Sequence, residues 1–214
     1  MPDTFHLKLD NLSKRYNVGP YVISEFNYEF QKGRATALVG PNGSGKTTLL
    51  RLLSVSAFPT SGSIKYGDLN IFNHPHQYLS KVGIVYDQPD LPGYLSTIEL
   101  LEWVMRNRGL WNSDTQNKIN GLLDQLLLDE RRNNLIGTYS SGMMKKAQIA
   151  AALIASPAIL LMDEPFKGLD EESKQATIDL LKDFISNGQI LIVSSHIKAT
   201  LEPICNDYIS FPLH

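Results

Sequence analysis

The alternation of hydrophobic and polar residues near the N-terminus predicts strands with one buried face. Phe5, Leu7 and Leu9 alternate with polar residues, and a second run rich in β-forming residues covers 21–30. A period of two is typical of strands whose other face meets solvent. The first thirty residues are therefore expected to form an outer antiparallel sheet.

Further along, short runs are continuously apolar and predict a different kind of strand. These runs cover residues 35–39, 82–86, 159–162 and 190–193. Such runs, set between longer segments, are typical of parallel strands buried on both faces. The first leads through a glycine-rich turn into a helical pattern at 46–55, which is a strand, loop and helix. Together they predict a doubly wound α/β sheet.

The segment between about residues 89 and 138 has a helical pattern. Ser96 and Glu99 can form a capping box, apolar residues follow at helical spacing, and Gly109 can end that helix. The leucines at 122–127 predict a second helix, and a polar stretch at 129–134 leads back to the core. This segment is expected to be a helical insert.

Composition narrows the class of protein. The 214 residues are 43% hydrophobic and 20% charged, which fits one folded α/β unit. The net charge of −2 provides no broad positive field, so direct nucleic-acid binding is not expected. Cys205 is the only cysteine, which suits a reducing compartment. No secretion signal and no apolar stretch of spanning length are found, so a cytoplasmic location is expected.

A glycine-rich segment between the predicted strand at 35–39 and the helix after it fits the G-x-x-x-x-G-K-[ST] phosphate loop. Glycines let main-chain N–H groups point at phosphate oxygens, Lys46 can reach the terminal phosphates, and the Thr47 hydroxyl can hold Mg²⁺. A chance glycine-rich turn is the alternative. The expected nucleotide-binding residues here are Gly40, Pro41, Asn42, Gly43, Ser44, Gly45, Lys46, Thr47 and Thr48.

Two carboxylates, Asp163 and Glu164, follow the buried run at 159–162. This order places one acid on the magnesium ion and the next beside the attacking water. Asp163 is therefore expected to bind the metal, and Glu164 is the candidate general base. The alternative is an ordinary pair of solvated charges that ends a buried strand.

With these motifs in order, nearly the whole chain resembles the ATP-binding subunits of ABC transporters. Where that family has its signature, usually Leu-Ser-Gly-Gly-Gln, this chain has Tyr-Ser-Ser-Gly-Met at 139–143. Ser140 can cap the following helix, whose N–H groups then offer a second phosphate-binding surface. A simple helix cap is the alternative. The resemblance implies that Ser140, Ser141 and Gly142 complete the site of a second subunit, with Ser141 in place of the usual glycine.

The resemblance also implies roles for four single residues. Gln88 matches the glutamine that touches magnesium or water, and His196 matches the histidine that contacts the γ-phosphate. For His196 a capping or core histidine is the alternative. Asp170 matches the aspartate that communicates between two sites, although Lys167 and the glycine after it stand where the family often has serine and alanine. Tyr16 stands where the family places an aromatic ring that stacks on adenine.

The resemblance implies an α/β fold with a P-loop NTPase core, a mainly parallel sheet, an N-terminal antiparallel β subdomain and a helical insert. One domain would span 1–214, with the core and β subdomain at about 1–88 and 139–214 and the helical subdomain at 89–138. It further implies an ATP hydrolase that uses ATP and Mg²⁺ as a homodimer or with a paired ABC subunit. Two alternatives stay open: a soluble ABC ATPase of an assembly or regulatory complex, and a nucleotide-gated module with little turnover.

The partner is expected to be a separate transmembrane permease subunit, which would hold this chain at the inner face of the cell membrane. Its docking place is expected at a groove between the core and the insert, bounded by Gln88 and residues 89–103. Leu91, Tyr94 and Leu95 are apolar residues in this connector and could line a socket for a helix. The alternative is that Leu91 and Leu95 pack beneath the insert's own helix.

Overall fold

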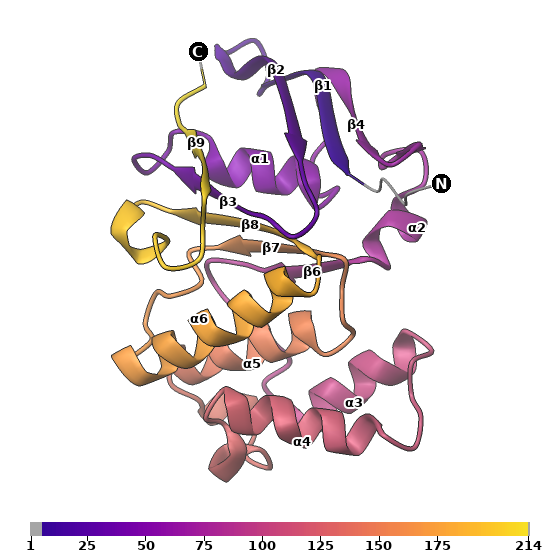
Figure 1. Cartoon of the computed structure of the whole chain (residues 1–214), viewed down its shortest axis with the longest axis vertical. Coiled ribbons are helices and arrows are strands. Elements are labelled where there is room, and N and C mark those ends of the chain that lie inside the picture. Colours follow the sequence, from indigo (N-terminus) through magenta and orange to yellow (C-terminus); the bar gives the residue numbers. More distant parts are fainter. Residues whose placement is uncertain (1–5, 214) are drawn as a thin grey trace.

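The computed structural model describes residues 6–213, so Phe5 in the predicted alternation lies outside the described residues. Its layers follow one another along the long axis of the molecule (Figure 1). An antiparallel sheet lies at one end, helix α1 (Lys46–Leu53) separates it from a parallel sheet, and a helical segment forms the other end.

The antiparallel sheet contains the two strands expected from the N-terminal pattern. β1 (Leu7–Arg15) pairs with β2 (Tyr21–Phe30) on one side and with β4 (Ser61–Tyr66) on the other, and the short β5 (Leu69–Asn70) lies at the edge. Leu7 and Leu9 are buried whereas the polar residues between and after them are exposed. The alternating pattern therefore predicted the buried face correctly, while β4 and β5 were not predicted.

The second sheet is parallel at every pairing, in the order β6-β7-β8-β3-β9. Its strands are β3 (Ala35–Val39), β6 (Val82–Val85), β7 (Ile159–Asp163), β8 (Ile190–Ser195) and β9 (Asp207–Ser210). Every residue of β7 and β8 is buried, as the continuously apolar runs predicted. Because the strands are parallel, the ends of β3, β6, β7 and β8 meet at one edge of the sheet, where the candidate chemistry lies.

Two hydrophobic clusters fix the layers. Helix α1 packs between the sheets and buries Leu49, Leu50, Leu52 and Leu53. Helices α5 (Ser141–Leu153) and α6 (Glu171–Ser186) cover the opposite face of the parallel sheet (Figure 1). Each fully buried leucine contributes about 1.5–3 kcal/mol relative to an exposed one, so these clusters supply much of the stabilisation. The short α2 (Pro75–Leu79) joins the two sheets.

The predicted insert is helical. It contains α3 (Thr97–Asn107), α4 (Thr115–Gln125) and 3₁₀ turns at Asp129–Arg131 and Ile136–Thr138; a further 3₁₀ turn, Lys198–Thr200, follows β8. The capping box of α3 is confirmed, since the main-chain N–H of Ser96 donates to Glu99 Oε2 over 2.8 Å and Ser96 Oγ accepts from the N–H of Glu99. The main-chain N–H and the hydroxyl of Ser96 both donate to the Glu99 carboxylate and lower its pKa. Gly109 follows the helix end with φ 67°, which confirms that it ends α3.

Across residues 6–213, no helix combines the length and the apolar character that a bilayer crossing requires.

Candidate nucleotide-binding and hydrolytic site

The loop between β3 and α1 makes a turn that depends on glycine. At Gly40, with φ 152°, an added Cβ would lie 2.6 Å from the carbonyl oxygen of Phe211. At Gly45, with φ 112°, it would lie 2.8 Å from the side chain of Val22. Both positions combine a left-handed backbone with close neighbours, so larger residues would displace the loop.

The polar groups of this loop fit a phosphate. Lys46 Nζ donates to the carbonyls of Gly40 and Pro41 over 2.7 and 2.9 Å, which folds the cation over the loop. Ser44 Oγ is buried without a hydrogen-bond partner among the described residues. No side chain caps the N-terminus of α1 at Gly45. An unpaired buried hydroxyl, an uncapped helix start and a buried lysine together form a place where an anion would satisfy several groups at once.

Thr47 and Asp163 lie together at the start of α1 and the end of β7. Thr47 Oγ1 donates to Asp163 Oδ2 over 2.8 Å. The other carboxylate oxygen, Asp163 Oδ1, accepts a short hydrogen bond from Ser194 Oγ. Hydroxyl and carboxylate oxygens are the ligands that Mg²⁺ prefers, so these two residues fit a magnesium ion. Ser194 was not singled out in the sequence, although the two serines after the apolar run at 190–193 were a usable signal.

Glu164 begins the loop after β7 in a left-handed conformation, with φ 47°. Its main-chain N–H bonds to Ser194, and its carboxylate accepts from the N–H of His196 over 2.8 Å, with His196 Nδ1 at 2.9 Å and Ser195 Oγ at 3.3 Å. A left-handed non-glycine residue costs on the order of 1–3 kcal/mol and persists where the surrounding contacts fix it. The contacts with Ser195 and His196 hold the Glu164 carboxylate in one orientation.

A cavity of about 190 Å³ joins these groups. The phosphate loop forms one wall, and Asp163 and Glu164 form part of the other. The lining residues are Asn42, Gly43, Gly45, Lys46, Thr47, Thr48, Asp87, Asp163 and Glu164. Six of the nine expected phosphate-loop residues are thus brought together with Asp163 and Glu164 around one space, whereas Gly40, Pro41, Ser44 and His196 are not among its lining residues.

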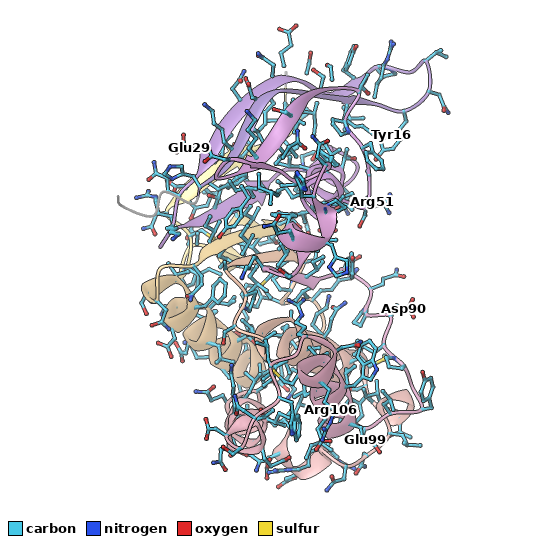
Figure 2. All side chains as sticks on the ribbon, turned by 90° about the vertical axis from the view of Figure 1, so that its right-hand side faces the viewer. Tyr16, Glu29, Arg51, Asp90, Glu99 and Arg106 are labelled. Carbon is cyan, nitrogen blue, oxygen red and sulfur yellow. The ribbon has the colours of Figure 1, made fainter. Side chains whose placement is uncertain are left out.

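The residue after β6 that lines this cavity is Asp87 rather than Gln88. Gln88 lines an adjoining cavity of about 480 Å³, which also reaches Thr47, Asp163 and the connector residue Asp90. Figure 2 shows Asp90 between Arg51 on the core side and Arg106 on the insert side. Sequence reasoning missed Asp87. Its place immediately after a buried parallel strand was the signal that could have identified it.

The segment expected to bind a second nucleotide lies outside the cavity. Ser140 caps α5, with its Oγ accepting from the N–H of Met143 over 3.2 Å, and both Ser140 and Ser141 are exposed. A Cβ on Gly142 would lie 2.6 Å from the carbonyl oxygen of Gly168, so this turn packs on the loop between β7 and α6. The helix cap is confirmed, and its N–H groups belong to a surface separate from the phosphate loop.

The structure also shows the contacts of Asp170 and Tyr16, two other residues expected at the site. Asp170 caps α6 and accepts from the N–H of Ser173 over 2.7 Å, and this bond lowers its pKa. The Tyr16 ring is 45% exposed, with Lys14 Nζ 4.8 Å from its centroid. Figure 2 shows Tyr16 at the antiparallel-sheet end of the molecule, above Arg51 of α1. Its exposed face can stack on a flat ligand.

The fold and the cavity define a P-loop NTPase. A family model described as ABC transporter matches residues 23–167. The chain belongs to this ABC transporter family.

Curated relatives agree with this assignment. The chain is 32% identical over 200 residues to Nod factor export ATP-binding protein I of Cupriavidus pinatubonensis, covering 94% of this chain and 61% of that protein. It is also 32% identical over 205 residues to the lantibiotic transport ATP-binding protein SrtF of Streptococcus pyogenes, covering 96% and 86%. The chain thus spans about three fifths of the length of its Nod factor export relative.

Solved structures share the fold. A structure described as the ATP binding subunit of an ABC transporter superposes with a TM-score of 0.89 at 26% identity, covering 96% of this chain and 85% of that one. A dimeric bacterial ABC transporter cassette gives 0.84 at 24% identity, covering 96% and 94%.

Proposed function

We propose that this chain is the ATP-binding subunit of an ABC transporter and hydrolyses ATP to drive a membrane-embedded partner. The observation that carries the proposal is the single cavity where Lys46 and Thr47 face Asp163 and Glu164. Few activities other than nucleotide hydrolysis use a phosphate loop, a metal-binding oxygen pair and a held carboxylate in one space.

Thr47 and Asp163 would hold Mg²⁺, which supplies positive charge against the β- and γ-phosphates. Lys46 would leave the loop carbonyls for the phosphates, because a charged acceptor makes the stronger hydrogen bond. Glu164 would accept a proton from the attacking water as the γ-phosphate bond to ADP breaks. His196 holds the Glu164 carboxylate through two contacts, so the base is oriented by a neighbouring strand.

Dimerisation is part of this proposal. The capped start of α5, with Ser140, Ser141 and Gly142, lies outside the phosphate cavity and would complete the site of a second subunit. In a two-fold symmetric dimer each chain supplies both a phosphate loop and a capped start of α5. A homodimer or a pair with another ABC subunit would therefore complete the nucleotide sites. Asp170 would communicate with the second site. Tyr16 would stack on adenine.

A transmembrane permease subunit would dock at the groove between the core and the insert. A cavity of about 620 Å³ there is lined by Tyr86, Leu91 and Trp103, among others. Leu91 and Leu95 are partly buried and pack against the hydrophobic cluster that the insert shares with the parallel sheet, which agrees with the alternative that they pack beneath the insert's helix. Tyr94 is 79% exposed and Trp103 58%, which leaves aromatic surface for an apolar helix. Docking would place the chain at the inner face of the membrane.

The whole of 1–214 would act as one unit, with the helical subdomain at 89–138 moving against the core. The relatives' names describe export of Nod factor and transport of lantibiotics, which supports transport over an assembly or regulatory role. The contact between Glu164 and His196 supports turnover over a module that only binds nucleotide.

The proposal is tested by calorimetric titration of Mg-ATP into the wild-type chain and Lys46→Ala. Loss of a cationic partner should weaken binding at least about tenfold, the range for a hydrogen bond to a charged group. Lys65→Ala removes an exposed lysine from β4 on the outer sheet and should leave affinity unchanged. Wild-type affinity in Lys46→Ala would refute the assignment of the phosphate loop.

A further inference from the structure

An ion pair joins two segments at the rim of the phosphate cavity. Lys167 Nζ donates to Asp87 Oδ1 and Oδ2 over 2.9 and 3.1 Å. Asp87 follows β6, whereas Lys167 lies in the loop between β7 and α6, 80 positions further along the chain. The Asp87 side chain is 34% exposed and that of Lys167 59% exposed. The pair therefore brings a lysine from the base-bearing loop onto a carboxylate that lines the cavity.

The main chain at Asp87 is held independently. Lys145 of α5 is 2% exposed, and its Nζ donates to the carbonyls of Tyr86 and Asp87 over 2.6 and 2.8 Å. Burial lowers the pKa of Lys145. Because the main chain is fixed by Lys145, the remaining freedom of Asp87 is mainly that of its carboxylate, which Lys167 restrains.

The negative charge of Asp87 makes its restraint by Lys167 important for ATP binding. Asp87 adds a third carboxylate to a cavity that already contains Asp163 and Glu164. ATP is itself strongly anionic, so an uncompensated carboxylate beside its phosphates would weaken binding. The hydrogen bonds to Asp87 raise the pKa of Lys167, so the pair favours the charged form of the lysine. The loop that carries Lys167 also packs on the start of α5, where Gly142 meets Gly168.

We propose that Lys167 is the positioning residue for Asp87. It holds the Asp87 carboxylate at the rim of the cavity and offsets its charge, so that Mg-ATP can bind beside three carboxylates. This inference rests on the proposed ATPase function. Lys167 acts through Asp87, and its effect on nucleotide binding therefore depends on the charge at position 87.

A double-mutant cycle tests this dependence. Calorimetry measures Mg-ATP affinity for the wild-type chain, Lys167→Met, Asp87→Asn and the double variant. Lys167→Met should weaken affinity on the order of threefold to tenfold in the wild-type background and less than about twofold in the Asp87→Asn background. The loss should shrink as salt is raised, since screening weakens the interaction between exposed charges. Lys182→Met, which removes an exposed lysine 3.9 Å from Asp179 on α6, should leave the affinity unchanged.

Equal losses in both backgrounds, or no loss in either, would overturn the proposal. Lys167→Gln keeps a donor without the charge and should behave like Lys167→Met; wild-type affinity in this variant would show that charge is not what matters. Thermal unfolding of each variant separates an effect on folding from one on binding. A wild-type chain that binds no Mg-ATP would instead contradict the proposed function, before the cycle is measured.

Discussion

The Glu164 carboxylate and the His196 ring meet at the ends of neighbouring parallel strands, with Oε1 and Nδ1 2.9 Å apart. The main-chain N–H of His196 donates to the same oxygen over 2.8 Å. Because an ionised carboxylate only accepts, Nδ1 carries the proton in this contact, and Nε2 is left for another partner. The candidate base is thus oriented by β8 although it belongs to the loop after β7.

Ser194 should tune the metal site through Asp163. Ser194→Ala removes the hydrogen bond to Asp163 Oδ1, so the carboxylate becomes less well oriented toward a metal. The Mg²⁺ concentration for half-maximal ATPase activity should rise about 10-fold, the lower end for loss of a group that orients a metal ligand. Ser186→Ala, which removes a hydroxyl from the end of α6, serves as the control. An unchanged Mg²⁺ dependence would show that Ser194 does not orient the ligand.

The elements predicted well from the sequence were those with a local pattern. The apolar runs of β3, β6, β7 and β8, the phosphate loop and the Ser96 capping box need only neighbouring residues to be identified. β4, β5 and β9 contain no continuous run of buried apolar residues, so their pairing with distant strands, rather than their own pattern, makes them strands.

The difference between Asp87 and Gln88 has a simple physical origin. Successive side chains of an extended segment point to opposite sides, so of two polar neighbours after a strand only one faces a given cavity. Whether Asp87 or Gln88 faces the cavity depends on the residue at which β6 stops pairing with β7. The contacts of Lys145 and Lys167 with Asp87 could not be predicted either, because they join residues 58 and 80 positions apart.

We expect Tyr94 to contribute to docking of the membrane partner and not to ATP hydrolysis. Tyr94→Asp should leave basal ATPase activity and thermal stability near wild type, because the ring is 79% exposed. It should abolish co-purification of a protein with spanning helices, identified by mass spectrometry, from detergent-solubilised native membranes. Leu127→Asp, an exposed position after α4 that lines neither groove cavity, is the control. Unchanged capture by Tyr94→Asp would contradict docking at this surface.

The edge strand β9 should confer an acid-sensitive part of the stability. Arg34 Nε and Nη2 each donate to Asp207 over 2.6 Å, which lowers the pKa of the Asp207 carboxyl. A lowered folded-state pKa stabilises the protein above the unfolded value near pH 4, and this contribution is lost as the pH falls through the folded value.

Asp207→Asn should therefore lower the free energy of unfolding at pH 7, and the difference from wild type should shrink as the pH falls through the lowered folded-state pKa of Asp207. Urea unfolding at several pH values measures this, with the exposed Asp10→Asn on β1 as control. A difference that stays constant with pH would exclude the ion pair as its cause.

Dimerisation should become visible when hydrolysis is blocked. Glu164→Gln with saturating Mg-ATP should accumulate as a dimer in light scattering, because the closed state is no longer reopened. If only monomer is seen, Ser141→Gly in the same background identifies the reason. Dimer in that double variant would mean that Ser141 weakens the contact, and monomer would mean that the dimer needs its membrane partner.

The central claim, that this chain hydrolyses ATP with Glu164 as its base, is tested most directly by phosphate release at saturating Mg-ATP. The wild-type chain should release phosphate, and Glu164→Gln should bind Mg-ATP with near wild-type affinity while its turnover falls about 100- to 10,000-fold, the range for a lost general base. Turnover by Glu164→Gln at the wild-type rate would contradict the account.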